Sequence, residues 1–207
     1  MIIAVDGPTA SGKGTIAKAL AHHFGLPHLD TGLLYRAVGR QCFLDGGNPD
    51  DPVDALAACT FPEGLLEDAE LRSEASGGLA SRVSIHPVVR QALFERQRAF
   101  ATQSGGAVLD GRDIGTVIAP DADAKLFVKA TPAIRARRRH TELAKAGSSV
   151  TYDRVLADIR ARDERDSSRS TAPLVMAADA APLDTSTLSI EVAVERAIAL
   201  VEAQRGK

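Results

Sequence analysis

The chain has 207 residues, 44% of them hydrophobic and 25% charged, which is ordinary for a soluble globular protein and enough for one α/β domain. A net charge of −2 and an aromatic content of 4%, without tryptophan, argue against a nucleic-acid surface of basic patches and stacked rings. The two cysteines, Cys42 and Cys59, lack metal-ligand spacing; with no signal peptide and no membrane-spanning apolar segment, we expect a cytoplasmic protein without a membrane partner.

The predicted elements alternate between strands and helices along the chain. We expect strands at 2–5, 26–30, 107–109, 124–130 and 181–186, and helices at 14–25, 31–46, 86–103, within 131–170, and at 189–204. The acidic segment at 48–84 is broken by proline and glycine, and we interpret it as an insert of short elements. The alternation predicts an α/β fold with a mainly parallel sheet and helices on both faces.

The first turn, "DGPTASGKGT" at 6–15, has the pattern of a phosphate-binding loop. Such a loop aims backbone N–H groups and a helix N-terminus at one anion, and Lys13 can reach the β- and γ-phosphates. Gly14 separates Lys13 from the first hydroxyl residue, Thr15, which we expect to contact Mg²⁺, partly through water. A glycine-rich turn with a surface lysine is the alternative. The predicted ATP contacts in the loop are Gly7, Pro8, Thr9, Ala10, Ser11, Gly12, Lys13, Gly14 and Thr15.

Two further clusters follow predicted strands, at the edge of the sheet where doubly wound folds bind ligands. "HLDTGLLYR" at 28–36 offers Thr31, Tyr35 and Arg36, of which Arg36 can hold a phosphate through paired hydrogen bonds. "LDGRDIG" at 109–115 places Arg112 and Asp113 in a loop after an apolar strand. The alternatives are a solvated first helical turn for the former and a structural turn for the latter.

The segment 135–169 is strongly basic, with nine arginines and one lysine against six acidic residues. Arginines flank the polar, glycine-containing tip "KAGSSVTYDR", which indicates a mobile lid that carries guanidinium groups onto a polyphosphate. The alternative is a helical hairpin stabilised by ion pairs between residues three or four apart.

Taken together and in this order, the clusters resemble the bacterial cytidylate kinase family, a nucleoside monophosphate kinase group of P-loop kinases. The resemblance covers nearly the whole chain and is carried by "DGPTASGKGT", "LDTGLLYR", "VVRQALFERQRAF", "DGRDIGTVIAPDADAKLFVKA", "ARDERDSSRSTAPLVMAADA" and "LDTSTLSIE". It implies a P-loop kinase fold and reversible transfer of the ATP γ-phosphoryl group to CMP or dCMP, with Mg²⁺ as the cofactor.

The resemblance also implies roles for individual residues. Lys13 and Arg138 would serve ATP, and Arg36, Arg112 and Arg169 the acceptor phosphate. The implied catalytic residues are Lys13, Arg112, Asp113, Arg162 and Arg169. The implied acceptor-binding residues are Thr31, Tyr35, Arg36, Ser81, Arg90, Gly111, Arg112, Asp113, Arg162, Asp166 and Arg169. Of these, Ser81, Arg90 and Asp113 would read the cytosine edge, where Asp113 accepts from the amino group and the other two donate to O2 and N3.

The resemblance also divides the single P-loop kinase domain, 1–207, into three parts. The core comprises 1–47, 85–130 and 171–207; an insert on the monophosphate side spans about 48–84, and the lid about 131–170. The insert is shorter than in the longer family members, and Thr31 stands where the family often has serine.

Two other functions compete with this interpretation. Another small-molecule P-loop kinase would act on both UMP and CMP, on AMP or on a non-nucleotide. A nucleotide- or RNA-binding regulator would instead use the arginines without phosphoryl transfer. The latter predicts steeply salt-dependent nucleic-acid binding, which the negative net charge disfavours. We expect no nucleic-acid partner and a monomer.

Overall fold

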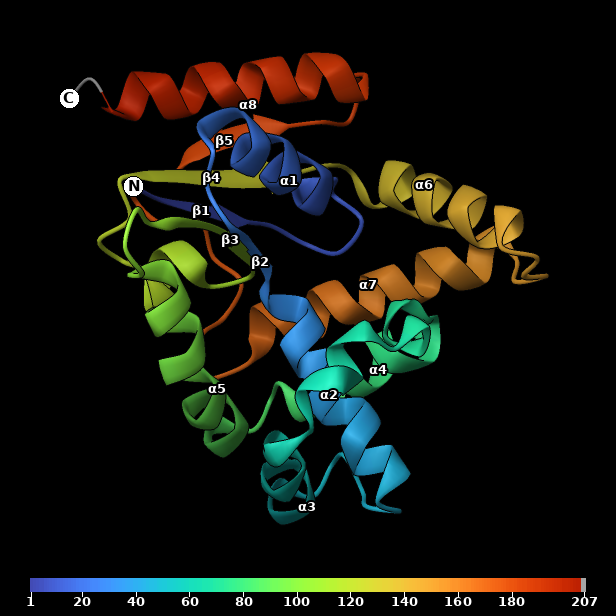
Figure 1. Cartoon of the computed structure of the whole chain (residues 1–207). Coiled ribbons are helices and arrows are strands. Elements are labelled where there is room, and N and C mark those ends of the chain that lie inside the picture. Colours follow the sequence, from blue (N-terminus) through green and yellow to red (C-terminus); the bar gives the residue numbers. More distant parts are fainter. Residues whose placement is uncertain (206–207) are drawn as a thin grey trace. The chain divides into compact units, whose positions relative to one another are not determined.

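The computed structural model describes residues 1–205, and within them each predicted strand and helix forms (Figure 1). The strands are β1 (Ile2–Asp6), β2 (His28–Asp30), β3 (Ala107–Gly111), β4 (Ala124–Lys129) and β5 (Ala181–Asp184). The helices are α1 (Lys13–Phe24), α2 (Thr31–Leu44), α3 (Pro52–Ala57), α4 (Glu74–Val83), α5 (Pro87–Ala101), α6 (Pro132–Lys145), α7 (Tyr152–Ser168) and α8 (Ile190–Arg205). Four short turns complete the order, namely η1 (Ala58–Thr60), η2 (Glu63–Glu67), η3 (Ala69–Arg72) and the π-helical turn η4 (Ile114–Ile118).

The sheet has the strand order β2-β3-β1-β4-β5, and β1 pairs in parallel with both β3 and β4. In this register Val5 lies opposite Asp110 and Leu126. The consecutive residues Ile3, Ala4 and Val5 are all 0% exposed. Because neighbouring side chains of a strand point to opposite faces, β1 is covered on both faces, as parallel sheets require. The predicted α/β fold with a parallel sheet is confirmed.

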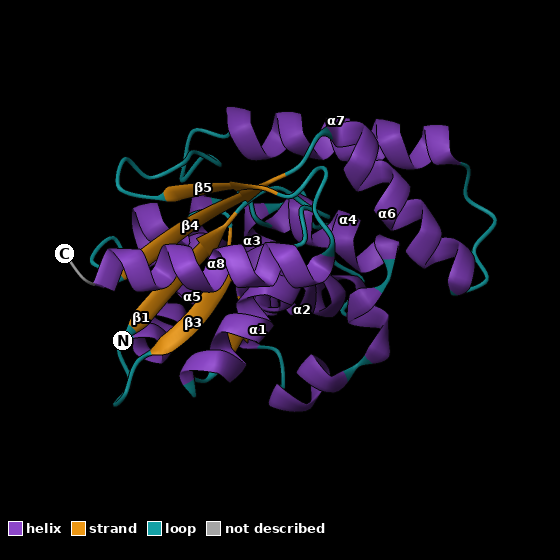
Figure 2. Cartoon of the chain, turned by 90° about the horizontal axis from the view of Figure 1, so that it is seen from above, coloured by secondary structure: helices purple, strands orange, loops and turns teal. Residues whose placement is uncertain are grey.

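Two helices cover one face of the sheet, since α1 packs against β3 and α8 against β4 and β5 (Figures 1 and 2). Ile16, Ala17 and Leu20 of α1 form one buried cluster with apolar residues of β1, β3, β4, β5 and α8. Gly25 ends α1 in the left-handed conformation, as its position in the sequence predicts. This packing fixes where β1 ends and α1 begins, and therefore fixes the loop between them.

The chain separates into two compact units. One comprises residues 1–29 and 101–207 and contains β1, β3, β4, β5 and the helices α1, α6, α7 and α8; the other is formed by residues 30–100. Between residues 31 and 100, all of which the structure describes, every regular element is helical. The acidic segment forms α3, η1, η2, η3 and α4, and Asp51 and Ser73 cap α3 and α4 by accepting from Val53 and Ser76 N–H.

The polar segment after β4 forms the helical hairpin α6–α7 (Figure 1). Thr131 and Thr151 cap the two helices, each accepting from the N–H three residues ahead. Ala136, Val155 and Ile159 make a small buried seam between the helices. Among residues 1–205, no helix combines the length and the hydropathy needed to cross a membrane.

Candidate nucleotide-binding site

The loop between β1 and α1 approaches β4 closely and leaves the start of α1 open to a ligand. A Cβ at Gly7 would lie 2.1 Å from the carbonyl oxygen of Val128, so a side chain there would force the loop away from the sheet. Gly12, with φ 92°, precedes α1, and no side chain caps that helix terminus. The first N–H groups of a helix have no acceptor within the helix, and the helix dipole is positive there, so this terminus favours an anion.

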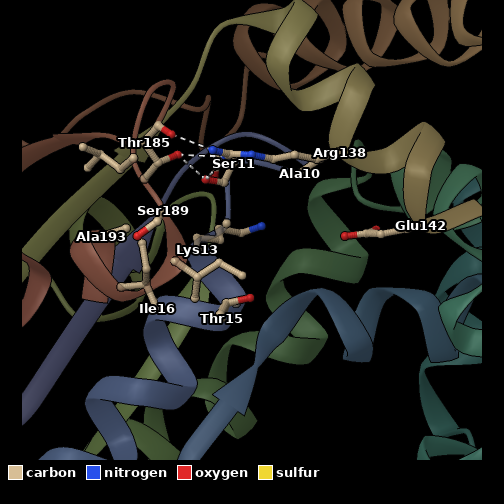
Figure 3. Close-up of a pocket in the computed structure, with 14 residues that line it drawn as sticks. Ala10, Ser11, Lys13, Thr15, Ile16, Arg138, Glu142, Thr185, Ser189 and Ala193 are labelled. Carbon is tan, nitrogen blue, oxygen red and sulfur yellow. Dashed lines mark hydrogen bonds between the residues drawn. The ribbon is translucent and has the colours of Figure 1, made fainter. Parts of the chain in front are cut away.

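A cavity of about 450 Å³ lies beside this loop (Figure 3). The ammonium of Lys13 and the hydroxyl of Thr15 point to the same side of the loop, toward Glu142 of α6. The predicted ATP contacts that line the cavity are Ala10, Ser11, Gly12, Lys13, Gly14, Thr15 and Arg138. Gly7, Pro8 and Thr9 do not line it, and Gly7 acts through the close approach of the loop to β4. The cavity volume is within the range of small-molecule sites.

Part of the cavity wall was missed by the sequence analysis. It comes from the carboxyl end of β5 and the start of α8, together with one residue each from α1 and α6, namely Thr185, Leu188, Ser189, Ile190, Ala193, Ile16 and Glu142. The signal available was the run "LDTSTLSIE" after the last predicted strand. Because β5 is parallel to β1, the carboxyl ends of both strands meet at the same edge of the sheet.

Arg138 joins the hairpin to the wall of this cavity. Its guanidinium donates to Thr185 Oγ1 at 3.0 Å, to the Thr185 carbonyl at 2.6 Å and to the Ser11 carbonyl at 3.4 Å (Figure 3). Thr185 Oγ1 in turn donates to the Ser11 carbonyl at 2.9 Å. Arg138 therefore holds the phosphate loop and the segment after β5 together at the mouth of the cavity.

Two other arginines of the hairpin, Arg135 and Arg154, form ion pairs with aspartates of α7. Arg135 is 3% exposed, forms a bidentate pair with Asp163 of α7 and donates to the Ala130 and Thr9 carbonyls. This pair holds α6 against α7 and against the phosphate loop, so Arg135 stabilises the hairpin. Arg154 pairs with Asp158 one turn further along α7, as the ion-pair interpretation predicts.

The loop after β3 meets α7 and the segment that follows it. Arg112 Nε donates to Asp166 Oδ2 at 2.7 Å, and Arg169 Nη2 lies 3.9 Å from Asp113 Oδ1. Burial raises the pKa of the Asp166 carboxyl, but Arg112, with Arg169 and Arg162, outweighs it and holds that pKa below its ordinary value. The structure thus brings five predicted acceptor residues into one charged cluster.

Of the remaining predicted acceptor residues, Gly111 ends β3, and the other five lie in the helical unit of residues 30–100. The Arg90 guanidinium stacks over the Tyr35 ring at 5.5 Å and donates to the Ser84 carbonyl at 3.4 Å. Arg36 donates to the Leu71 and Ser73 carbonyls at 2.7 and 3.0 Å. Within this unit α4, which carries the buried Ser81, packs against α2, which begins with the buried Thr31.

A contact that the sequence analysis missed holds the carboxylate at the end of β3. His28 Nε2 donates to Asp110 Oδ1 at 2.7 Å, and Asp110 is 2% exposed. The other oxygen, Oδ2, lies 3.8 Å from the position that a Cβ on Gly14 would take. The Asp110 carboxylate therefore faces the phosphate loop.

The residues around the loop fit a magnesium ion that is held mainly by nucleotide phosphates. Thr15 supplies a hydroxyl oxygen at the cavity, the type of donor that Mg²⁺ prefers. Across residues 1–205, no three histidine, cysteine, aspartate or glutamate side chains gather into a metal-binding group. The donor set therefore suits an ion that keeps waters and phosphate oxygens as most of its ligands.

Comparison with known proteins assigns the family. The family model described as cytidylate kinase matches residues 3–203. The chain belongs to the cytidylate kinase family. The curated relatives include a cytidylate kinase of Xanthobacter autotrophicus, 57% identical with 99% of both chains covered, and one of Azorhizobium caulinodans, 56% identical with 100% of both covered. A crystal structure of an uncharacterized protein from Eubacterium ventriosum matches with a TM-score of 0.58 at 15% identity, covering 98% of this chain and 99% of that one, which shows a shared fold.

Proposed function

We propose that the protein reversibly transfers the γ-phosphoryl group of ATP to CMP or dCMP, giving ADP and CDP or dCDP. The observation that carries this proposal is the cavity at the N-terminus of α1, lined by Lys13 and Thr15, in a chain of the cytidylate kinase family. The acceptor phosphate is already ionised and needs no strong general base. The protein's contribution is therefore to position both nucleotides and to stabilise charge during an in-line transfer.

On the donor side, the loop from Gly7 to Thr15 binds the ATP phosphates, with Ala10 to Thr15 facing the cavity, and Lys13 neutralises charge on the phosphoryl group that moves. Thr15 would hold Mg²⁺, partly through water, and the bound ion would supply positive charge that screens the phosphates. Arg138 closes the wall of the site through Thr185 and Ser11, and this geometry supports its assignment to ATP.

On the acceptor side, Arg36, Arg112 and Arg169 bind the CMP phosphate, and Thr31, Tyr35 and Gly111 complete the site. Ser81, Arg90 and Asp113 read the cytosine edge, and Arg162 and Asp166 lie near the sugar or phosphate. Two observations support the set, namely the stacking of Arg90 on Tyr35 and the contacts of Arg112 with Asp166 and of Arg169 with Asp113. The division into a core, an insert at about 48–84 and a lid at about 131–170 is part of the same proposal.

We further propose that the enzyme acts as a monomer in the cytoplasm. Cys42 and Cys59 are both free thiols, and burial raises the pKa of each, which suits a reducing compartment. Light scattering of the purified chain tests the oligomeric state directly.

An acceptor screen tests the proposed activity. CMP, dCMP, UMP and AMP are each incubated with ATP and Mg²⁺, and ADP release is measured. We expect turnover with CMP and dCMP, and much less with UMP, because its O4 would face the Asp113 carboxylate and leave polar groups unpaired. Preferred turnover of AMP or UMP, or none with any acceptor, would contradict the proposal.

A further inference from the structure

Asp6 ends β1 directly before the phosphate loop, and its side chain points to the turn η4, which follows β3. Oδ1 accepts from the Ile114 N–H at 2.8 Å, and Oδ2 accepts from the Gly115 N–H at 2.7 Å. These are the first two residues of η4, whose N–H groups have no acceptor within the turn. Asp6 is 5% exposed, so its carboxylate caps η4 from inside the protein.

The Asp6 carboxylate takes the capping role that the residue directly before η4, Asp113, would ordinarily have. Asp113 precedes η4 in the N-cap position, where an aspartate ordinarily accepts from the N–H groups ahead of it, but its side chain makes no capping hydrogen bond. Its Oδ1 lies instead 3.9 Å from Arg169 Nη2. Because Asp6 caps the turn, the carboxylate of Asp113 is directed to partners outside it.

The same contact joins the two halves of the proposed reaction site. Asp6 lies opposite Gly111 in the parallel pairing of β1 with β3, and the next two residues of that strand's loop are Arg112 and Asp113. The residue after Asp6 is Gly7, which begins the phosphate loop. One buried carboxylate therefore links the backbone of the donor loop to the backbone of the acceptor loop.

We propose that Asp6 is a positioning residue for acceptor recognition, whose carboxylate holds η4 so that Arg112 and Asp113 meet the acceptor nucleotide. This inference rests on the proposed function, in which Arg112 and Asp113 bind CMP. Asp6 touches neither nucleotide in this scheme and acts through the two backbone N–H groups.

Burial of the ionised Asp6 carboxylate lowers the stability of the folded protein above about pH 6, and this loss favours a functional reason for a charge at this position. Burial raises the pKa of Asp6 to about 6, against the lowering effect of the two backbone hydrogen bonds. The charged groups that face it are Asp113, which raises its pKa, and Lys13, which lowers it, while Lys125 packs its side chain beside Gly115. A carboxyl with a raised pKa in the folded state is stabilising at low pH and loses that contribution as pH rises through about 6.

The test is Asp6→Asn, measured at pH 8, where Asp6 is ionised in the wild type. The amide offers one acceptor to two N–H donors, so η4 loses one hydrogen bond to a charged group. We expect KM for CMP to rise about tenfold or more, with KM for ATP changed less than about twofold. Equal changes in both KM values, or no change in either, would overturn the proposal.

Two further variants keep the test sharp. A Cβ at Gly115 would lie 3.1 Å from Lys125 Cδ and 3.4 Å from Asp6 Oδ2, so Gly115→Ala crowds the contact between Asp6 and η4 without removing the charge. It should raise KM for CMP a few-fold and leave KM for ATP unchanged, which decides the matter if Asp6→Asn does not fold. The matched control is Asp123→Asn, because Asp123 accepts from the Ile2 N–H at the other end of β1 and should leave both KM values unchanged.

The proposed function and this inference fail in different ways. If the wild type does not phosphorylate CMP, the proposed function is wrong whatever the variants do. If the wild type phosphorylates CMP and Asp6→Asn and Gly115→Ala keep the wild-type KM for CMP, the function stands and the positioning role is wrong.

Discussion

Arg112 Nε donates to Asp166 Oδ2 at 2.7 Å, a hydrogen bond between the loop after β3 and helix α7 that spans 54 residues of sequence. Both side chains are largely buried, and the carboxylate also lies in the field of Arg169 and Arg162. The pair therefore orients one arginine of the proposed acceptor site and ties α7 of the hairpin to the loop after β3.

Removing this carboxylate should reduce stability in a pH-dependent way. Asp166→Asn should lower the free energy of unfolding by about 2 kcal/mol at pH 7, because the half-buried Arg112 loses an ionic partner. The pKa of Asp166 is lowered in the folded state, so its contribution is present above its unfolded pKa and is lost as pH falls through the folded value. Denaturant unfolding of both proteins from pH 7 to pH 3 should show the difference shrinking; a constant difference would contradict the assignment.

Lys13→Ala should abolish most of the turnover. Loss of a cation that stabilises charge on the transferred phosphoryl group should reduce kcat by about 10²–10³-fold. Lys18→Ala, an exposed lysine of the same helix that does not line the cavity, is the control and should keep wild-type kcat. If Lys13→Ala also keeps wild-type kcat, the loop is not the ATP phosphate site.

Arg36→Ala should weaken the use of CMP much more than the binding of ATP. We expect KM for CMP to rise about tenfold or more, as for loss of a charge-assisted phosphate contact. Arg40→Ala, one helical turn further along α2, removes a weak pair with Asp68 at 3.6 Å and serves as the control. Because Arg36 also donates to two backbone carbonyls, thermal unfolding is measured alongside, and an equal rise in both KM values would exclude Arg36 from the acceptor site.

Asp113→Asn should relax the discrimination between CMP and UMP. The carboxylate accepts from the cytosine amino group in the proposed site, whereas an amide can also donate to the O4 of uracil. The ratio of kcat/KM for the two acceptors should fall about tenfold or more relative to wild type. A variant that is as selective as the wild type would show that Asp113 does not read the base.

The local parts of the fold were predictable because their signals lie close together in the sequence. The apolar run before Asp6, the glycines of the phosphate loop and the stop at Gly25 predicted β1, the loop and α1 close to their observed bounds. The hairpin of residues 131–170 was predicted from its polarity and from the glycine-containing tip between its arginines. The π-helical turn η4 was not, because it has no local periodicity and is held by Asp6, more than a hundred residues away.

The contacts of the charged side chains were also only partly predictable from the sequence. The sequence indicated that the arginines of the hairpin were either phosphate ligands or ion-pair partners, without assigning each one. Folding paired Arg135 with Asp163, placed Arg138 against Thr185 and set Arg112 beside Asp166. Which partner an arginine meets depends on how α6 and α7 pack, and the packing brings together residues that are far apart in the chain.

The sequence by itself determined the class of protein, because a phosphate loop, an acceptor motif and a basic lid in fixed order are a linear pattern. Only the tertiary structure decided how the site is held. It joined the carboxyl ends of parallel strands, made Thr185 and Ser189 part of the cavity wall, and turned Asp6 and His28 toward η4 and Asp110. The physical reason is that these contacts form between strands and turns that only the sheet brings together, and no local pattern encodes them.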